Sequence, residues 1–265
     1  MPFAIFYGWP SLVNGSRGDI GRAAEQFACF EAAILGDAIP TADGDPRGRA
    51  VAEQVSGACH LHGYLSLGCG IGQPDWSARD IRSRLRLWGR WGVEGVLLDC
   101  AGRDFGVSPA RLTDAVAAAH DRGLRVVVNA WDPFDVLGSR AELGAADALL
   151  AENDVLRHGV MRPPGAYQAR LARIELARRE LGVTVWAVGT SGPVAPASYS
   201  GRLTTAVVQS WRGAAAEQPA LFCVADPLYG ASDNRMPLPR SDVEPEAEQP
   251  EVRETLAGLV SGPVL

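Results

Sequence analysis

Two carboxylates in this 265-residue sequence stand where chemistry would need them, each at the end of an apolar run. Asp99 ends the run GVLLD (95–99), and Glu152 ends the run ADALLAE (146–152). Runs without polar alternation are typical of strands that are buried on both faces. An acid that ends such a strand either caps a turn or points out of the core to react with a ligand. The capping alternative has Asp99 closing the loop CAGRDFG and Glu152 pairing with Arg157.

The rest of the sequence supplies the elements that would position these acids. Short apolar runs alternate with helical patterns along the whole chain, and a Ser, a Pro and a Gly mark the ends of the pattern at 108–123. The eight runs are FAIFYGW (3–9), ACFEAAIL (28–35), HLHGYLSL (60–67), GVLLD (95–99), RVVVNAW (125–131), ADALLAE (146–152), VTVWAVG (183–189) and ALFCVAD (220–226). Helices are expected over 19–27, 47–56, 77–91, 108–123, 166–182, 199–217 and 250–260, with a short one at 140–144.

Eight strands in strict alternation with helices predict an α/β fold, the (βα)8 TIM barrel. We find no shift in composition that would mark a domain boundary, so the expectation is a single domain over 1–265. An acidic surface loop is expected at 241–251, where the sequence reads SDVEPEAEQPE.

A barrel of this kind carries its catalytic groups at the carboxyl ends of its strands. Asp99 and Glu152 fall on the fourth and sixth strands, so their carboxyl groups should converge, about 5–9 Å apart, over the barrel axis. Such a pair suits general acid–base catalysis or attack on an anomeric carbon. Further candidates for binding a substrate at the same rim are Tyr7, Trp9, Glu31, His62, Tyr64, Asn129, Trp131, Asp226 and Tyr229.

Each of these candidates also has a purely structural interpretation. Glu31 lies inside an apolar run, where it must be paired or face the lumen, and His60 or His62 would be its partner. His62 itself is the type of histidine that is more often a satisfied core residue, although the following Gly63 would let a ligand or backbone approach. The aromatic residues could stack on sugar rings or simply cover the core.

Composition and motifs exclude several classes of function. The net charge is −6, and all 25 basic side chains are arginine, a composition typical of a GC-rich bacterial genome. An acidic chain lacks the basic face that nucleic acid requires. No apolar stretch is long enough to span a membrane. The sequence holds no zinc-ligand spacing, no Walker motif and no Rossmann glycine motif, so we expect no metal and no cofactor.

The N-terminal sequence MPFAIFYGWPSLV has no basic segment of the kind that begins a secretory signal peptide. We therefore expect a cytoplasmic protein, or a secreted one if a leader is removed from the chain.

The middle of the chain resembles the spherulation-specific proteins and the related endo-α-1,4-polygalactosaminidases, which are barrel glycosidases. The segments HLHGYLSLG (60–68), DIRSRLRLWGRWGVEGVLLD (80–99), VVVNAWDP (126–133) and ADALLAEND (146–154) occur in the order of that family's motifs. The resemblance implies a (βα)8 fold, hydrolysis of galactosamine-containing polysaccharide, and catalytic acids at Asp99 and Glu152. The family's Asn-Pro-Gly is replaced by Asn129-Ala130-Trp131, so the floor of the sugar site differs.

The sequence therefore predicts a glycoside hydrolase that uses Asp99 and Glu152 on a small-molecule or carbohydrate substrate. Which acid is the nucleophile and which is the proton donor stays open at this point. One alternative is a biosynthetic lyase, isomerase or cyclase that uses the same acids as general acid and base. Another is a barrel that binds carbohydrate without catalysis.

Overall fold

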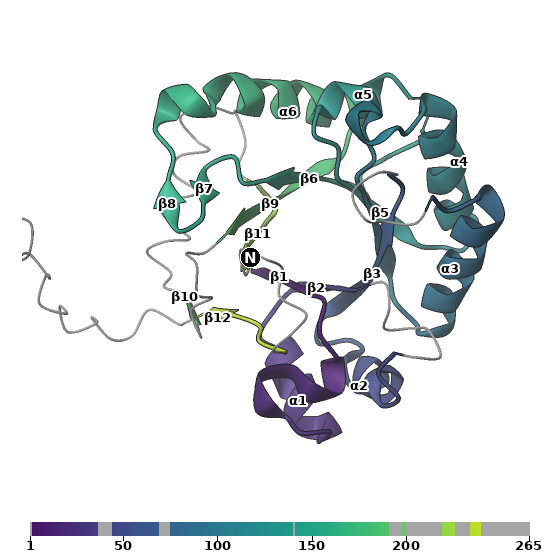
Figure 1. Cartoon of the computed structure of the whole chain (residues 1–265), viewed down its shortest axis with the longest axis vertical. Coiled ribbons are helices and arrows are strands. Elements are labelled where there is room, and N and C mark those ends of the chain that lie inside the picture. The colour runs from purple at the N-terminus through teal and green to yellow at the C-terminus, as the bar shows by residue number, and fades with distance from the viewer. Residues whose placement is uncertain are drawn as a thin grey trace, which may run out of the picture.

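Eight parallel strands form the centre of the computed structural model, which describes residues 2–36, 44–68, 75–139, 141–190, 198–199, 219–225 and 234–239. The strands follow one another in space as they do in sequence, and a bridge between Pro2 and Phe222 brings the last one back to the first. In order they are β1 (Phe3–Phe6), β2 (Ala32–Leu35), β3 (His60–Ser66), β4 (Gly95–Asp99), β5 (Arg125–Val128), β6 (Ala148–Glu152), β9 (Thr184–Thr190) and β11 (Leu221–Ala225). This nearly closed ring confirms the predicted (βα)8 barrel (Figure 1).

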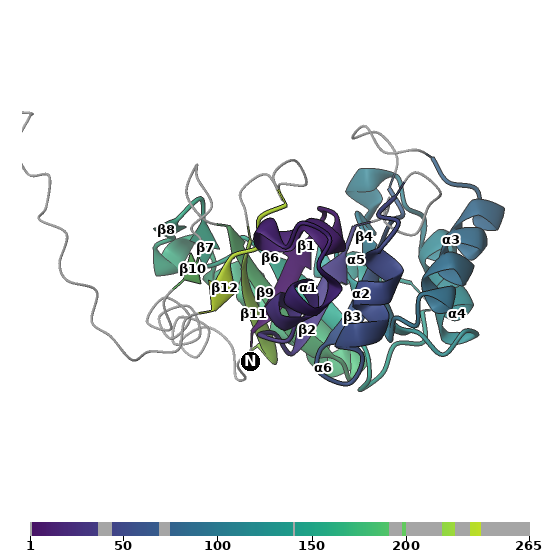
Figure 2. The same cartoon turned by 90° about the horizontal axis from the view of Figure 1, so that it is seen from below.

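Helices lie outside the strands along the lower, right and upper sides of the ring in Figure 1, and Figure 2 shows the same arrangement turned by 90°. The α-helices in the described ranges are α1 (Ile20–Phe27), α2 (Gly48–Val55), α3 (Ala78–Arg90), α4 (Pro109–His120), α5 (Pro133–Leu137) and α6 (Gln168–Leu181). Short 3₁₀ turns lie at η1 (Pro10–Gly15), η2 (Arg103–Phe105) and η3 (Pro164–Ala166). None of the helices in these ranges has both the length and the apolar character needed to cross a bilayer.

Local sequence signals explain where the two best predicted helices begin. Ser77 and Asp80 form a reciprocal capping box at the start of α3, each side chain bonding the backbone of the other. Ser108 accepts a hydrogen bond from the backbone of Arg111 at the start of α4, with Pro109 in the first turn. Both helices lie within the ranges that the sequence predicted.

The barrel has an inner and an outer apolar layer because successive side chains of a strand point to opposite faces. Side chains that fill the lumen belong to alternate positions of each strand, and those between them pack against the helices. The lumen layer contains Phe3, Ile5, Ile34, Tyr64, Leu97, Val127, Leu150, Trp186, Val188 and Cys223, among others. This alternation fixes which residues beyond each strand end can face the barrel axis.

Two small sheets lie outside the barrel. The long connection that the sequence predicted at 153–165 contains an antiparallel hairpin of β7 (Leu156–Arg157) and β8 (Val160–Met161). A second pair joins β10 (Ser198–Tyr199) to β12 (Leu238–Pro239) in parallel. The predicted helices at 199–217 and 250–260 and the acidic loop at 241–251 lie outside the described residues.

The structure corrects two of the predicted elements. Residues 141–144 are not helical, and the short helix of this part of the chain is α5, which starts earlier where Asp132 caps it and Pro133 opens it. The second strand begins at Ala32 rather than at residue 28, because residues 28–31 form a turn after α1. Glu31 therefore precedes its strand instead of lying within it.

Gly63 has a different role from the one that the sequence suggested. It lies on the outer face of β3, where the indole of Trp88 packs directly against the backbone, and a Cβ at this position would lie 2.2 Å from a Trp88 ring carbon. Trp88 is fully buried, and its indole N–H donates a 3.1 Å hydrogen bond to the carbonyl of Tyr64. The glycine thus admits a helix side chain, not a ligand.

We predict that Gly63→Ala lowers the free energy of unfolding by about 1–3 kcal/mol, because Trp88 must move to make room. Gly89→Ala is the matched control, since this exposed position of α3 has open space around a new Cβ. The control should raise stability by about 0.5–1 kcal/mol through its higher helix propensity. Urea denaturation of both variants measures the difference, and equal stabilities would contradict the packing argument.

Candidate functional site

Three neighbouring strands place a polar side chain at their last lumen-facing position. Leu97, Val127 and Leu150 face the lumen, so the residues two positions further on also face it. Those residues are Asp99, Asn129 and Glu152, at the carboxyl ends of β4, β5 and β6. The carboxyl ends of parallel strands open on one face of a barrel, the face on which (βα)8 enzymes hold their active sites.

The amide of Asn129 joins the two carboxylates. Its Nδ2 donates to Asp99 Oδ1 at 2.8 Å and to Glu152 Oε2 at 3.1 Å. Because both oxygens contact one nitrogen, these two distances limit their separation to about 5.9 Å. The two acids therefore meet over the axis, and both can contact one small substrate.

Neutral donors also bind the two carboxylate oxygens that do not contact Asn129. Tyr64 donates its hydroxyl hydrogen to Asp99 Oδ2 at 2.7 Å, and Asn153 Nδ2 donates to Glu152 Oε1 at 3.2 Å. Burial raises the pKa of the Tyr64 hydroxyl well above its ordinary value, and the charge of Asp99 raises it further. Tyr64 therefore stays protonated and remains a donor. The ring of Tyr7 meets the ring of Tyr64 edge-on, 5.2 Å away.

A left-handed residue follows each acid. Cys100 has a φ of 50° and Asn153 a φ of 56°. Such a backbone is uncommon outside glycine, and for Cys100 no short polar amide side chain eases it. Strained backbone of this kind is often found at functional sites. Here it turns the chain sharply out of β4 and β6 at the point where the carboxylates face the axis.

Cys100 also adds a thiol that sequence reasoning missed. Burial, and after it the charge of Asp99 beside the thiol, raise the pKa of Cys100 to about 12, and the more distant Glu152 acts in the same direction. The group is thus a neutral thiol next to Asp99. In the sequence, the sign that Cys100 belongs to the site was its position directly after Asp99, the acid that ends β4.

Thr190 orients the amide that bonds Glu152. Its hydroxyl donates to Asn153 Oδ1 at 2.7 Å and accepts from the backbone N–H of His158 at 2.9 Å. Because the amide oxygen of Asn153 is occupied, its nitrogen turns toward Glu152. The hairpin of β7 and β8 thereby fixes one wall of the site through a backbone group.

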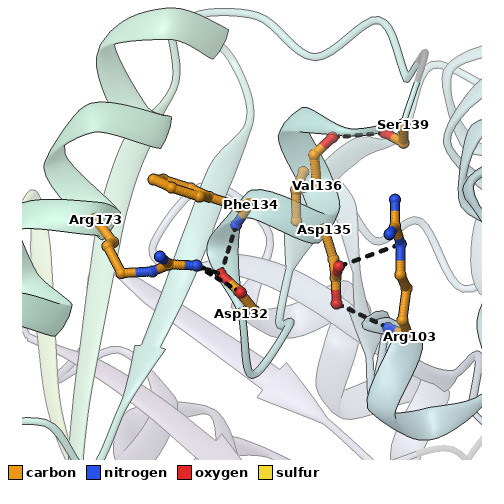
Figure 3. A network of polar contacts seen from close by, with 7 residues as sticks. All are labelled: Arg103, Asp132, Phe134, Asp135, Val136, Ser139 and Arg173. Carbon is orange, nitrogen blue, oxygen red and sulfur yellow. Dashed lines mark hydrogen bonds and ion pairs between the residues drawn. The ribbon is translucent and has the colours of Figure 1, made fainter.

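Ion pairs anchor the segment that carries Asn129 and Trp131 (Figure 3). Arg173 of α6 donates to both oxygens of Asp132, at 2.6 and 2.5 Å. On the other side, Asp135 accepts a hydrogen bond from the backbone N–H of Arg103 at 2.8 Å and forms an ion pair with its guanidinium at 3.4 Å. The β5–α5 connection is therefore tied to the turn after β4 and to α6, which are its neighbours in the barrel.

The two exposed tryptophans of the predicted rim both follow strand ends. Trp9 comes after β1, is 43% exposed, and donates its backbone N–H to Asn234 Oδ1 at 2.7 Å. Trp131 comes after β5, is 60% exposed, and has the guanidinium of Arg170 over its ring at 5.0 Å. β1 and β5 lie on opposite sides of the barrel.

Other predicted site residues lie elsewhere. Glu31 precedes β2 at the amino end of the barrel, and its expected partner His60 instead contacts Glu94 at 2.8 Å. His62 is buried in the lumen against Trp186, and burial lowers its pKa to about 4, so it is a neutral core histidine. Asp226 and Tyr229 lie outside the described residues.

In the part of the chain that the structure describes, no three His, Cys, Asp or Glu side chains are grouped in a way that could hold a metal ion. The site described above consists of two carboxylates, two amides, hydroxyls and a thiol.

Asp154 is a buried acid one residue beyond Asn153. Its side chain is 3% exposed, and Oδ1 accepts a hydrogen bond from Arg170. Oδ2 makes no hydrogen bond within the described ranges. Asp154 also lines a small cavity together with Val155, Leu156 and Phe222. Burial raises the pKa of Asp154 to about 6, which the charge of Arg170 opposes only in part.

Comparison with known proteins finds the fold but no family. No family model matches the chain, and no curated protein sequence matches it. The carboxyl transferase domain of Rhizobium etli pyruvate carboxylase, solved as the Y628A variant with pyruvate, aligns with 85% of this chain at 10% identity and a TM-score of 0.51. The chain spans only 40% of the length of that protein.

Two further barrels align less closely. The lyase for 2,3-dimethylmalate, a member of the PEP mutase/isocitrate lyase superfamily, gives 10% identity, a TM-score of 0.46, and coverage of 87% of this chain and 76% of its own. A phosphonomutase candidate from Burkholderia cenocepacia gives 15% identity, a TM-score of 0.44, and coverage of 86% and 88%. At these levels the likeness extends to the barrel fold and not to an activity.

These findings overturn the glycosidase prediction. The four segments that suggested spherulation-specific proteins and polygalactosaminidases match no family model, and the barrel that aligns at a TM-score of 0.51 is a carboxyl transferase domain. Hydrolysis of a glycosidic bond and a carbohydrate substrate are therefore withdrawn. The order and spacing of those segments follow from the repeat of the barrel itself, which unrelated barrels share.

We predict that Asn129→Asp lowers the free energy of unfolding at neutral pH by roughly 1–3 kcal/mol, because it replaces a shared donor by a third carboxylate. The loss should shrink as the pH falls and the acids take up protons. Gln54→Glu adds the same charge at an exposed position of α2 and serves as the control. Chemical denaturation at pH 8 and pH 5 measures both, and equal losses in the two variants would contradict the bridging role.

A second prediction concerns Asp154. Its folded pKa of about 6 lies above the ordinary aspartate value of 3.8, so the unfolded chain releases the proton first as the pH rises. This group therefore lowers stability between about pH 4 and pH 6, and the loss persists above pH 6. Asp154→Asn, which cannot ionise, should match the natural protein near pH 4 and exceed it by roughly 2–3 kcal/mol at pH 7.

Denaturation of both proteins across this pH range measures the effect. Asp114→Asn, at an exposed position of α4, is the control and should show no such divergence. A constant difference between Asp154→Asn and the natural protein at all pH values would contradict the raised pKa.

Proposed function

We propose that this chain is a lyase or isomerase that acts on a small molecule, with Asp99 and Glu152 as its proton-transferring groups. The observation that carries the proposal is the single amide nitrogen of Asn129 that contacts both carboxylates. Two acids held this close can take a proton from one atom of a substrate and return it to another. Isomerisation and elimination need that pair of steps and no external nucleophile.

The surroundings of Asp99 suit it to be the base. It faces the axis at the carboxyl end of β4, and Tyr64 and Asn129 each donate to it. When Asp99 removes a proton from a substrate carbon, its negative charge is neutralised, and Tyr64 and Asn129 can adjust their hydrogen bonds to its oxygens. Tyr64 keeps its own proton, because burial and the charge of Asp99 hold its pKa high.

Glu152 is then the acid that completes the turnover. In an isomerase it delivers a proton to a different atom of the same substrate, and in a lyase it delivers one to the leaving group. Asn153 and Thr190 hold it in place from the opposite side of the pair. Afterwards the proton passes from Asp99 back to Glu152 directly or through solvent, which restores the starting state.

The test follows solvent deuterium into substrate carbon. Amines, amino alcohols, hydroxy acids and keto acids are incubated singly with the protein in D₂O, and proton NMR records the loss of each C–H signal. We expect exchange in one of these classes, and Asp99→Asn and Glu152→Gln should each slow it by about 10²–10⁴-fold. Glu25→Gln, which neutralises an exposed acid on α1, should leave the rate unchanged.

Exchange that persists at the natural rate in both Asp99→Asn and Glu152→Gln would contradict the proposal. Substrate that still binds to both variants while exchange is lost would separate catalysis by the pair from a barrel that only binds.

A further inference from the structure

The charge of Asp99 is held by neutral groups alone in the described structure. Tyr64 donates a hydroxyl hydrogen, Asn129 donates an amide hydrogen, and the thiol of Cys100 lies beside the carboxylate. An ionised carboxylate offers about four lone-pair positions, so these partners leave room for another donor. A half-buried carboxylate without a cation is electrostatically suited to receive one.

A second polar group at the same place has only a weak partner. Ser66 is 1% exposed, and its Oγ makes no hydrogen bond within the described ranges beyond a weak one with the thiol of Cys100. Ser66 is two residues after Tyr64 on β3, so it faces the lumen, and it pairs in register with Asp99. Buried hydroxyls in native proteins are hydrogen-bonded as a rule, so a hydroxyl left open beside a carboxylate points to a ligand.

Four arginines around this rim lie beside acids, while Arg162 donates to the backbone carbonyls of Asn153 and Ala166. Arg103 pairs with Asp135, Arg170 with Asp154 and Arg173 with Asp132. Arg111, whose guanidinium also donates to the carbonyl of Leu67, lies 3.6 Å from Asp75. Arg103, Arg170 and Arg173 therefore do not present an open charge to a phosphate or carboxylate group, whereas Arg111 Nη2 makes no hydrogen bond within the described ranges. The site itself places two acids together, which would repel such an anion.

We propose that the site takes a substrate carrying a protonated amine, with the ammonium group bound by Asp99 and Ser66. This inference rests on the proposed function and narrows its substrate class. An ammonium group has three N–H donors, which match the carboxylate of Asp99 and the open hydroxyl of Ser66. The rings of Tyr7 and Tyr64 lie next to Asp99 and offer the aromatic surface that organic cations favour. The net charge of −6 also attracts cations to the protein.

At the same rim, one cation already lies over an aromatic ring. The guanidinium of Arg170 lies 5.0 Å from the ring centre of Trp131, after β5. An aromatic side chain of this rim thus accepts a cation on its face in the folded protein. Trp9, across the barrel, has an exposed ring.

The experiment compares three probes that share one carbon skeleton and differ in charge. Propylammonium, propanol and propionate are each titrated into the full-length protein by calorimetry at pH 8 and constant ionic strength. We expect saturable binding of propylammonium only. Asp99→Asn should weaken it by tenfold or more, Ser66→Ala by several-fold, and the surface control Glu25→Gln should not change it.

Ser66→Ala also guards against a variant that fails to fold, because the only hydrogen bond it removes within the described ranges is the weak one with the thiol of Cys100. Its thermal unfolding and near-ultraviolet circular dichroism should match those of the natural protein. The inference is overturned if propionate binds more tightly than propylammonium, if none of the probes binds saturably, or if propylammonium binding is unaffected by both substitutions.

Failure of this inference and failure of the proposed function give different results. Deuterium exchange into a hydroxy acid that depends on Asp99 and Glu152 would preserve the proton-transfer function while excluding the amine. Propylammonium binding that depends on Asp99, together with amine exchange that is independent of both acids, would preserve the substrate class and exclude the mechanism.

Discussion

The site depends on the amide of Asn129, which lies between two carboxylates that would otherwise repel each other. Its two N–H groups are divided between Asp99 and Glu152, so the amide fixes both acids with one group that carries no net charge. A lysine or arginine there would neutralise the pair, and an apolar residue would leave it to separate. The neutral bridge keeps both acids available and close together, which is what proton transfer within one substrate needs.

The barrel supplies this geometry through packing on both faces of its strands. Trp88 packs against the outer face of β3 at Gly63 and bonds the carbonyl of Tyr64, while the hydroxyl of Tyr64 bonds Asp99 on the inner face. The position of helix α3 is thus connected to the position of the carboxylate. On the other side, ion pairs at Asp132 and Asp135 hold the segment that follows Asn129. The site is therefore rigid because its neighbours are packed or paired on each side.

The sequence was most informative where apolar runs determine the structure. All eight strands lie within or at the edges of the runs predicted for them, and Asp99 and Glu152 do end two of the strands. The ends of elements that depend on local turns were harder to predict. Glu31 proved to precede its strand, and α5 begins at Pro133 because Asp132 caps it there, whereas the helical pattern at 140–144 forms no helix over 141–144. Ser66 could not be singled out from types and spacing, since its role depends on register, and for Cys100 the sequence offered only its place directly after Asp99.

The family prediction failed for a related reason. It rested on the four segments at 60–68, 80–99, 126–133 and 146–154, of which the first contains Gly63 and the second Trp88. Gly63 and Trp88 pack against each other on the outer face, so part of that pattern reflects how a helix packs on a barrel strand and carries no information about a substrate. Function in a common fold has to be argued from the side chains that meet at its site.

The most direct test of the central claim is whether Asp99 and Glu152 act as one unit. The rate of deuterium exchange is compared among the natural protein, the two single variants and the double variant Asp99→Asn with Glu152→Gln. Groups that act together in one reaction have effects that do not add. The account predicts that the double variant is no slower than the slower single variant. Rate losses that multiply in the double variant would show that the two acids act independently, and would contradict a shared proton-transfer site.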